Sequence, residues 1–142
     1  MMHLVAEARS WIGTPYGHQA SVKGAGCDCL GLIRGIWRSL HGDEPTVIPR
    51  YADDWSEPQG EEVLWAAARH HMTAADDGPV KPGQVLLFRM RDGAVAKHLG
   101  VISAIGSAPA FVHAYSRHGV VESPLSDPWK RRIVARFEFQ KG

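Results

Sequence analysis

The sequence has few of the features that define disulfide-bonded, membrane or nucleic-acid-binding proteins. Its 142 residues include two cysteines, too few for the disulfide framework of a small secreted domain. No run of about 18 apolar residues is present, so we expect no transmembrane helix. The 16 basic and 15 acidic side chains leave a net charge of +1, which indicates neither nucleic acid nor an anionic membrane as a partner. A 44% hydrophobic composition predicts one domain over residues 1–142 that folds without a metal or disulfide.

The N-terminal segment, MMHLVAEARSWIG, also lacks the pattern of a secretory signal. It has no continuous apolar core of about 7–15 residues and no small-residue cleavage site. We therefore expect no signal peptide and synthesis in the cytoplasm. A role outside the cell would then require another means of delivery.

Helical patterns fill the first half of the sequence and strand patterns fill the second. Apolar residues recur at helical spacing over residues 2–12, 28–42 and 61–72, with Asp28 as the predicted N-cap and Gly42 as the stop of the second helix. The proline-rich residues 43–60 predict an irregular segment. Strand patterns follow over residues 84–90, 98–104, 110–115, 119–123 and 132–139. Helices followed by an antiparallel sheet indicate an α+β domain.

The stretch GAGCDCLGLIRG, residues 24–35, places two cysteines one residue apart before an apolar run. A zinc site needs about four ligands, and C-x-C without a second pair is a poor match. A disulfide between Cys27 and Cys29 would join side chains that diverge at a helix start. Two interpretations stay open: both cysteines are small buried hydrophobes, or one of them is a nucleophile.

Cys29 has the stronger physical basis as a nucleophile. In the first turn of a helix, unsatisfied N–H groups and the positive end of the dipole favour the thiolate. A nearby histidine would lower the thiol pKa further and hold the proton. Cys27 precedes the cap and lacks these advantages. We therefore predict Cys29 as the nucleophile, with no metal or other cofactor.

A nucleophile needs a base, and eight histidines are candidates. Of these, His98 and His113 occupy neighbouring predicted strands. If the short loop between these strands sets the register, Ala104 pairs with Pro109 and Gly100 opposes His113. The two histidines then share one face as diagonal neighbours, about 7–8 Å apart at the backbone and within side-chain reach. That geometry suits a base and an orienting group, although two histidines on one face can also be unrelated.

Four segments, taken in order, resemble the NlpC-type cell-wall cysteine peptidases, which have a compact papain-like fold. The resemblance runs from about Trp11 to Glu122 and implies N-terminal helices packed on a five- to six-stranded antiparallel sheet. It also implies Cys29 as the nucleophile, His98 as the general base and His113 as the orienting group. The segments are DCLGLI (28–33), KPGQVLLF (81–88), KHLGVI (97–102) and FVHAY (111–115), and WIGTPYG upstream resembles the Gly-x-Pro-Tyr loop of the family.

The same resemblance implies three substrate-binding positions. Tyr16 and Asp28 occupy the places that shape the oxyanion and substrate-amine region in the family. Asp28 could instead be only an N-cap, and Tyr16 only a packing aromatic. Leu30 replaces the serine of the family motif, and GHQASVKGAG (17–26) replaces the usual Trp-Gly-Gly loop. We expect both to line the substrate groove.

Longer segments resemble the phage-type branch of this family, which is encoded in tail modules and gene transfer agents. These segments are HQASVKGAGCDCLGLIRG, AVAKHLGV and HAYSRHGVVESPL. They imply a tail-tip peptidase. Our hypothesis is that it cleaves peptidoglycan stem peptides at the amide between D-glutamate and diaminopimelate. Its partners would be other tail-tip or hub proteins, and the particle tail would deliver it to the periplasm of the target cell.

Two alternatives use the same fold. One is a catalytically weak structural tail-tip protein, which the replacement of the motif serine by Leu30 favours. The other is an acyltransferase in which an amine or alcohol resolves a thioester formed at the same Cys–His site.

Trp55, Trp129 and Phe139 are further candidates for an exposed docking patch.

Overall fold

The computed structural model describes residues 2–42, 44, 60 and 62–139. The N-terminal part consists of helices α1 (Met2–Ser10) and α2 (Cys29–His41), with the short strands β1 (Ser21–Val22) and β2 (Gly26–Cys27) between them. Helix α3 (Val63–His71) and strand β3 (Thr73–Ala74) follow. The C-terminal part consists of β4 (Val85–Arg89), β5 (Ala96–Ala104), β6 (Ala110–Tyr115), β7 (Gly119–Pro124), α4 (Asp127–Lys130) and β8 (Ile133–Glu138).

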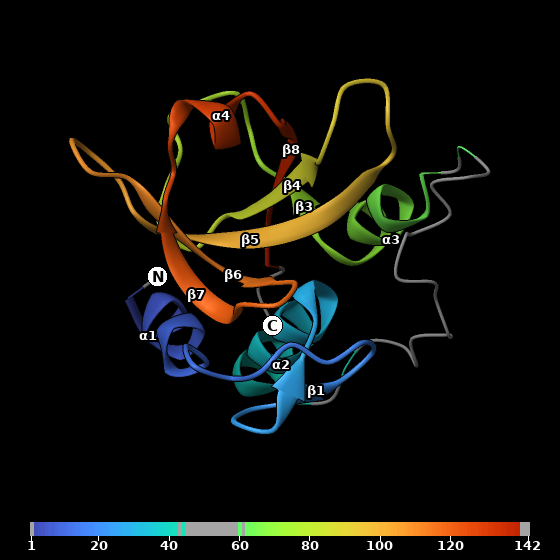
Figure 1. Ribbon diagram of the computed structural model, residues 1–142. Helices are drawn as coiled ribbons and strands as arrows, with labels where there is room; N and C mark the ends of the chain where they lie inside the picture. The colour runs from blue at the N-terminus through green and yellow to red at the C-terminus, as the bar shows by residue number, and fades with distance from the viewer. Residues whose placement is uncertain (1, 43, 45–59, 61, 140–142) are drawn as a thin grey trace.

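Six strands form one antiparallel sheet in the order β3-β8-β4-β5-β6-β7. Helices α1 and α2 lie on one face of this sheet, and the short helix α4 lies on the other (Figure 1). This arrangement confirms the predicted α+β class with N-terminal helices on an antiparallel sheet. None of the helices in the described part of the chain has the length and apolar character needed to cross a bilayer.

The alternation of side chains along β4 divides the core between the two faces of the sheet. Val85 and Leu87 point into the larger cluster, which includes buried residues of α1, α2 and α3. Leu86 and Phe88 point into the smaller cluster, against which Trp129 of α4 packs. All four of these β4 side chains are fully buried, so β4 is covered on both faces.

Most predicted elements are present within one or two residues of their expected bounds. Asp28 caps α2 and Gly42 ends it, as the sequence predicts. Most of the predicted irregular segment, residues 43 and 45–59, lies outside the described residues, as does position 61 at the predicted start of α3. The sequence did not predict β1, β2, β3 and α4, because elements of two to four residues are too short to establish a period.

The register between β5 and β6 agrees with the prediction in its centre and differs at its end. Val101 pairs with Val112, the alignment that places Gly100 opposite His113. Ala104, however, pairs with Ala110 and not with Pro109, because the ladder shifts between Ile102 and Ala104. Proline has no N–H to donate to a ladder, and the Pro109 carbonyl instead accepts a hydrogen bond from the Leu125 amide at 2.8 Å.

Gly35 of α2 packs against Trp11, the residue that directly follows α1. A Cβ at this position would lie 2.0 Å from Cζ2 of Trp11, a side chain that is 2% exposed. Because the indole ring is held in the core, it cannot move aside at little cost. The absence of a side chain at Gly35 therefore allows the Trp11 ring to lie against α2.

We predict that Gly35→Ala lowers the free energy of unfolding by about 1–3 kcal/mol, because overpacking outweighs the gain in helix propensity. Urea denaturation followed by circular dichroism measures the change. Ser39→Ala, on the exposed side of the same helix, should change it by less than about 0.5 kcal/mol, because the gain in helix propensity offsets the lost exposed hydrogen bond to Glu7. Equal stability of Gly35→Ala and the wild type would contradict the proposed packing.

Candidate active site

The buried carboxylate of Asp28 holds the start of α2. Oδ1 accepts a hydrogen bond from the Gly31 amide at 2.7 Å, and Oδ2 accepts one from the Gln19 amide at 2.7 Å. Asp28 is 2% exposed, and His18 Nδ1 lies 3.9 Å from Oδ2. Because both oxygens accept backbone N–H groups, this carboxylate serves as a helix cap that also anchors the preceding loop.

The loop GHQASVKGAG, residues 17–26, packs along the first turns of α2. A Cβ on Gly31 would lie 1.9 Å from the Ala20 carbonyl oxygen, so only glycine permits this approach. Ser21 Oγ donates a hydrogen bond to the Gly31 carbonyl at 2.6 Å, and Arg38 donates one to the Ser21 carbonyl at 2.6 Å. We expected this loop to line a substrate groove, and these contacts give it a structural role as the support of the helix start.

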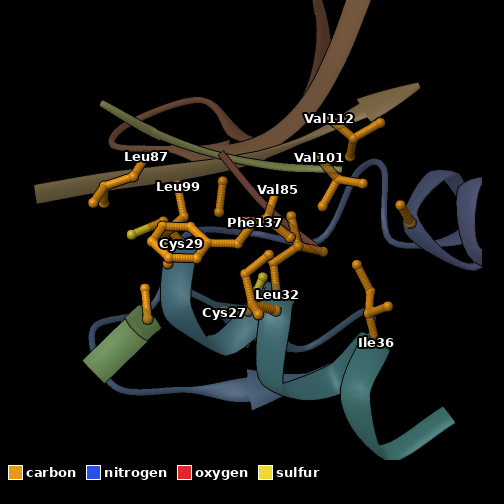
Figure 2. Packing of buried hydrophobic residues seen from close by; sticks show 14 of the residues in the cluster. Cys27, Cys29, Leu32, Ile36, Val85, Leu87, Leu99, Val101, Val112 and Phe137 are labelled. Carbon is orange, nitrogen blue, oxygen red and sulfur yellow. The ribbon is translucent and has the colours of Figure 1, made fainter. Parts of the chain in front are cut away.

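Cys29 is the first residue of α2 and lies against β5. It is 4% exposed and belongs to the helix-side core, where Figure 2 shows it among Leu87, Leu99 and Phe137. Its Sγ donates a long hydrogen bond of 3.9 Å to the Lys97 carbonyl. The thiol therefore lies next to the backbone that carries His98.

His98 and His113 are in direct contact, as the register predicts. His98 Nε2 lies 2.8 Å from His113 Nδ1, and the two rings meet nearly edge to face. Both side chains are buried, at 6% and 0% exposure. They pack against Phe88, Phe111 and Trp129, which places them on the sheet face opposite to α2.

Gly100 allows this packing. A Cβ at Gly100 would lie 2.7 Å from Cδ2 of Phe111 and 3.4 Å from the His113 Cβ. Any side chain here would push β6 and its rings away from β5. The glycine two residues after His98 therefore permits the close approach of His113.

The structure joins the two histidines to each other but not to the thiol. Across the described residues, the hydrogen bonds of Cys29 Sγ go to backbone groups, among them the Lys97 carbonyl, and none joins Sγ to an imidazole. Because Nε2 of His98 is hydrogen-bonded to His113, Nδ1 of His98 is the nitrogen that can receive a proton. Transfer from Cys29 would thus require Sγ to leave the Lys97 carbonyl and approach Nδ1.

No model of a known protein family matches the amino-acid sequence. A gamma-DL-glutamyl hydrolase from Bacillus subtilis (strain 168) is 30% identical over 138 residues, which cover 95% of this chain and 29% of the hydrolase. The chain thus spans less than a third of the length of this relative.

Similarity to solved structures identifies the fold of the chain. An NlpC/P60 family protein from Bacillus cereus ATCC 10987 superposes with a TM-score of 0.64 at 22% identity, over 96% of this chain and 39% of that one. The NlpC/p60 domain of the peptidoglycan hydrolase SagA superposes with a TM-score of 0.60 at 20% identity, over 96% of both chains. The chain has the fold of an NlpC/P60 domain. This agrees with the fold that the sequence motifs implied.

Within this NlpC/P60 fold, burial keeps the Cys29 thiol and both imidazoles uncharged. Burial raises the pKa of the Cys29 thiol to about 12, and the neighbouring charge of Asp28 acts in the same direction. Burial lowers the pKa of His98 to about 3, with a further contribution from His113. Burial, then the charge of His118, lowers the pKa of His113 to about 4. The expected lowering of the thiol pKa by the helix start is therefore outweighed by burial.

The other residues that the sequence analysis considered for the site lie before and after Cys29 in the chain. Tyr16 is half-buried and forms a parallel bridge with Cys27. Leu30 is partly buried against the helix-side core. Cys27 is fully buried, and burial raises its pKa to about 12; both cysteines are free thiols. Across the described residues, no group of three or more histidine, cysteine and acidic side chains is arranged to hold a metal ion.

Trp129 and Ser123 belong to the site but were missed by sequence reasoning. The indole centroid of Trp129 lies 5.7 Å from that of His98 and 5.2 Å from that of His113, so this residue is not part of an exposed patch. Phe139 is also partly buried against the core, and Trp55 lies outside the described residues. Ser123 could have been found from the tight β6–β7 turn, which fixes its register against Phe111. No periodic signal marks Trp129.

The buried neutral histidines predict a loss of stability in acid. A histidine whose pKa is lower in the folded than in the unfolded state stabilises the fold above pH of about 6.5. This contribution is lost as the pH falls toward the folded values of about 3 for His98 and about 4 for His113. We expect the free energy of unfolding to fall by on the order of a few kcal/mol between pH 7 and 4.

Urea denaturation at several pH values measures this dependence. A variant with both His98→Gln and His113→Gln should lose less stability over the same range than the wild type. His3→Gln, which removes an exposed histidine of α1, is the matched control and should retain the wild-type slope. Equal slopes in all three proteins would show that the buried pair does not determine the acid sensitivity.

Proposed function

We propose that this protein is a cysteine endopeptidase of the NlpC/P60 type that cleaves peptidoglycan stem peptides. The observation that carries the proposal is the position of Cys29, at the start of α2 and 3.9 Å from the backbone oxygen that precedes His98. The fold supports it, because the SagA domain with the same fold belongs to a peptidoglycan hydrolase. The motif order from Asp28 to Tyr115 supports it as well.

In the proposed mechanism, the proton of the Cys29 thiol passes to Nδ1 of His98 while Sγ attacks the carbonyl carbon of the scissile amide. The amide π pair moves onto oxygen, and backbone N–H groups at the start of α2 stabilise that oxyanion. The oxyanion then collapses and the C–N bond breaks as His98 gives its proton to the leaving amine, so that the acyl group remains on Sγ as a thioester. Water, deprotonated by His98, hydrolyses the thioester and restores the thiol. A hydrogen bond between Nδ1 of His113 and Nε2 of His98 holds the ring of His98 in place.

The scissile bond in this proposal is the amide between D-glutamate and diaminopimelate. The Bacillus subtilis relative supports it, because that protein is named a gamma-DL-glutamyl hydrolase. Tyr16 and Leu30, on either side of Cys29 in the sequence, would contact the peptide. Asp28 would act indirectly, since its oxygens are bonded to the Gly31 and Gln19 amides.

We further propose that the enzyme works as a component of a phage-like or gene transfer agent tail, which delivers it to the periplasm of the target cell. Support comes from the resemblance of the loop before α2 and of the β6–β7 hairpin to the tail-encoded branch. We expect mass spectrometry of particles purified from producing cells to detect the chain at a constant ratio to tail proteins. A chain found only outside purified particles would contradict this proposal.

A structural tail-tip role is the second candidate. Its supporting observation is the closed state of the thiol, which is 4% exposed and bound to the Lys97 carbonyl. Acyl transfer to an amine or alcohol would use the same thioester. Both alternatives differ from hydrolysis in their products, so one assay separates all three.

We predict that purified protein incubated with Gram-negative sacculi releases new D-glutamate termini, identified by the masses of the muropeptides. Cys29→Ala should lower the rate by at least about a thousandfold, and His113→Ala by about ten- to a hundredfold. Cys27→Ser is the matched control and should stay within a few-fold of the wild type, because Cys27 is buried beside Tyr16. Poly-γ-glutamate serves as a second substrate with a γ-glutamyl amide.

The results of this assay distinguish hydrolysis, acyl transfer and a structural role. No new termini on either substrate, or equal yields from Cys29→Ala, would exclude the enzyme and favour the structural role. Adducts with added amines or alcohols would indicate acyl transfer. Loss of activity in Cys27→Ser equal to that in Cys29→Ala would overturn the choice of nucleophile.

A further inference from the structure

Ser123, in β7, is hydrogen-bonded to the second histidine of the pair. Its Oγ lies 2.8 Å from Nε2 of His113, and Nδ1 of the same ring lies 2.8 Å from Nε2 of His98. In the β6–β7 ladder Ser123 pairs with Phe111 and Val121 pairs with His113, so Ser123 and His113 are diagonal neighbours on one face. Side chains from three adjacent strands thus form a continuous row of hydrogen bonds.

The other groups around this row are aromatic. The ring of His113 stacks on Phe111 with the centroids 4.1 Å apart, and Trp129 and Tyr115 contact both imidazoles. Within the described part of the chain, the Ser123 hydroxyl is the hydrogen-bond partner of His113 Nε2. The state of this hydroxyl therefore bears directly on which nitrogen of His113 carries the proton.

Two arrangements of protons satisfy the row when both rings are neutral. In the first, Ser123 donates to His113, whose Nδ1–H donates to Nε2 of His98. The single proton of His98 is then on Nδ1, and the ring cannot accept another there. In the second, Nε2–H of His98 donates to His113, whose Nε2–H donates to Ser123 Oγ. The second arrangement leaves a free lone pair on Nδ1 of His98.

The charged intermediate also requires the second arrangement. When the S–H bond breaks and its proton binds Nδ1, His98 carries protons on both nitrogens and its Nε2–H needs an acceptor. His113 Nδ1 can accept only if the proton of that ring is on Nε2, and that proton is donated to Ser123. Ser123 is half-buried, so its own hydroxyl proton can be donated to water.

We propose that Ser123 is a positioning residue of the site. By accepting the Nε2–H of His113, its hydroxyl holds both imidazoles in the tautomers that leave Nδ1 of His98 free to take the Cys29 proton. The row is then Cys29, His98, His113 and Ser123. The kinetic part of this inference rests on the proposed peptidase function, whereas the tautomers are a property of the folded protein without substrate.

Proton-detected ¹⁵N spectra of the imidazole rings test the tautomers directly. In the wild type at neutral pH we expect His98 and His113 to be protonated at Nε2. In Ser123→Ala we expect a population with the proton on Nδ1 of His98, because Nε2–H of His113 has lost its acceptor. Ser123→Thr keeps the hydroxyl and suits a strand, so it should retain the wild-type tautomers. Ser107→Ala, in the exposed loop between β5 and β6, is the control.

Kinetics on sacculi test the consequence. Ser123→Ala should lower kcat by about ten- to a hundredfold and change KM by less than about threefold. Ser123→Thr should restore most of kcat. A merely structural serine would leave the ring tautomers and the balance between kcat and KM unchanged.

Two results would overturn the proposal. One is a wild-type spectrum with the His98 proton on Nδ1, which needs no variant and decides the matter even if Ser123→Ala fails to fold. The other is a folded Ser123→Ala protein with wild-type tautomers. If the tautomers follow Ser123 but the wild type cleaves neither substrate, the proposed peptidase function fails while the positioning role stands.

Discussion

The site depends first on the buried carboxylate of Asp28. A carboxylate at 2% exposure is stable only if hydrogen bonds replace its lost water, and the Gly31 and Gln19 amides supply these bonds. The two bonds fix the first turn of α2 to the loop before it. Cys29 follows directly, so the cap also determines where the thiol meets β5. A local helix cap is thus the foundation of the candidate active site.

The two halves of the site lie on opposite faces of strand β5, with Cys29 of α2 on one face and His98 of β5 on the other. Leu99 and Val101 face the helices with Cys29, whereas His98 packs with the aromatic rings on the other face. Burial on both faces excludes water, which makes both a thiolate and an imidazolium unfavourable at rest. In the proposed mechanism the proton therefore moves as the bond to the substrate forms, rather than before it.

The sequence predicted the parts that local physics determines. The cap and stop of α2 follow from Asp28 and Gly42, and the central β5–β6 register follows from alternation and a short loop. Two expectations failed for identifiable reasons. Pro109 cannot donate to the ladder, so the pairing shifts by one residue near the loop. Burial outweighs the helix start in its effect on the thiol pKa, and burial is not visible in a motif.

The sequence by itself determined the order of helices and strands, the capped helix that begins at Cys29, and the contact between His98 and His113. These features follow from hydrogen bonds and periodicities that span a few residues. Only the tertiary structure decided that the thiol bonds to the Lys97 carbonyl, that Trp129 covers the imidazoles and that Ser123 ends their row of hydrogen bonds. These contacts depend on how distant elements pack against one another, and side-chain packing in three dimensions has no short-range signature in the chain.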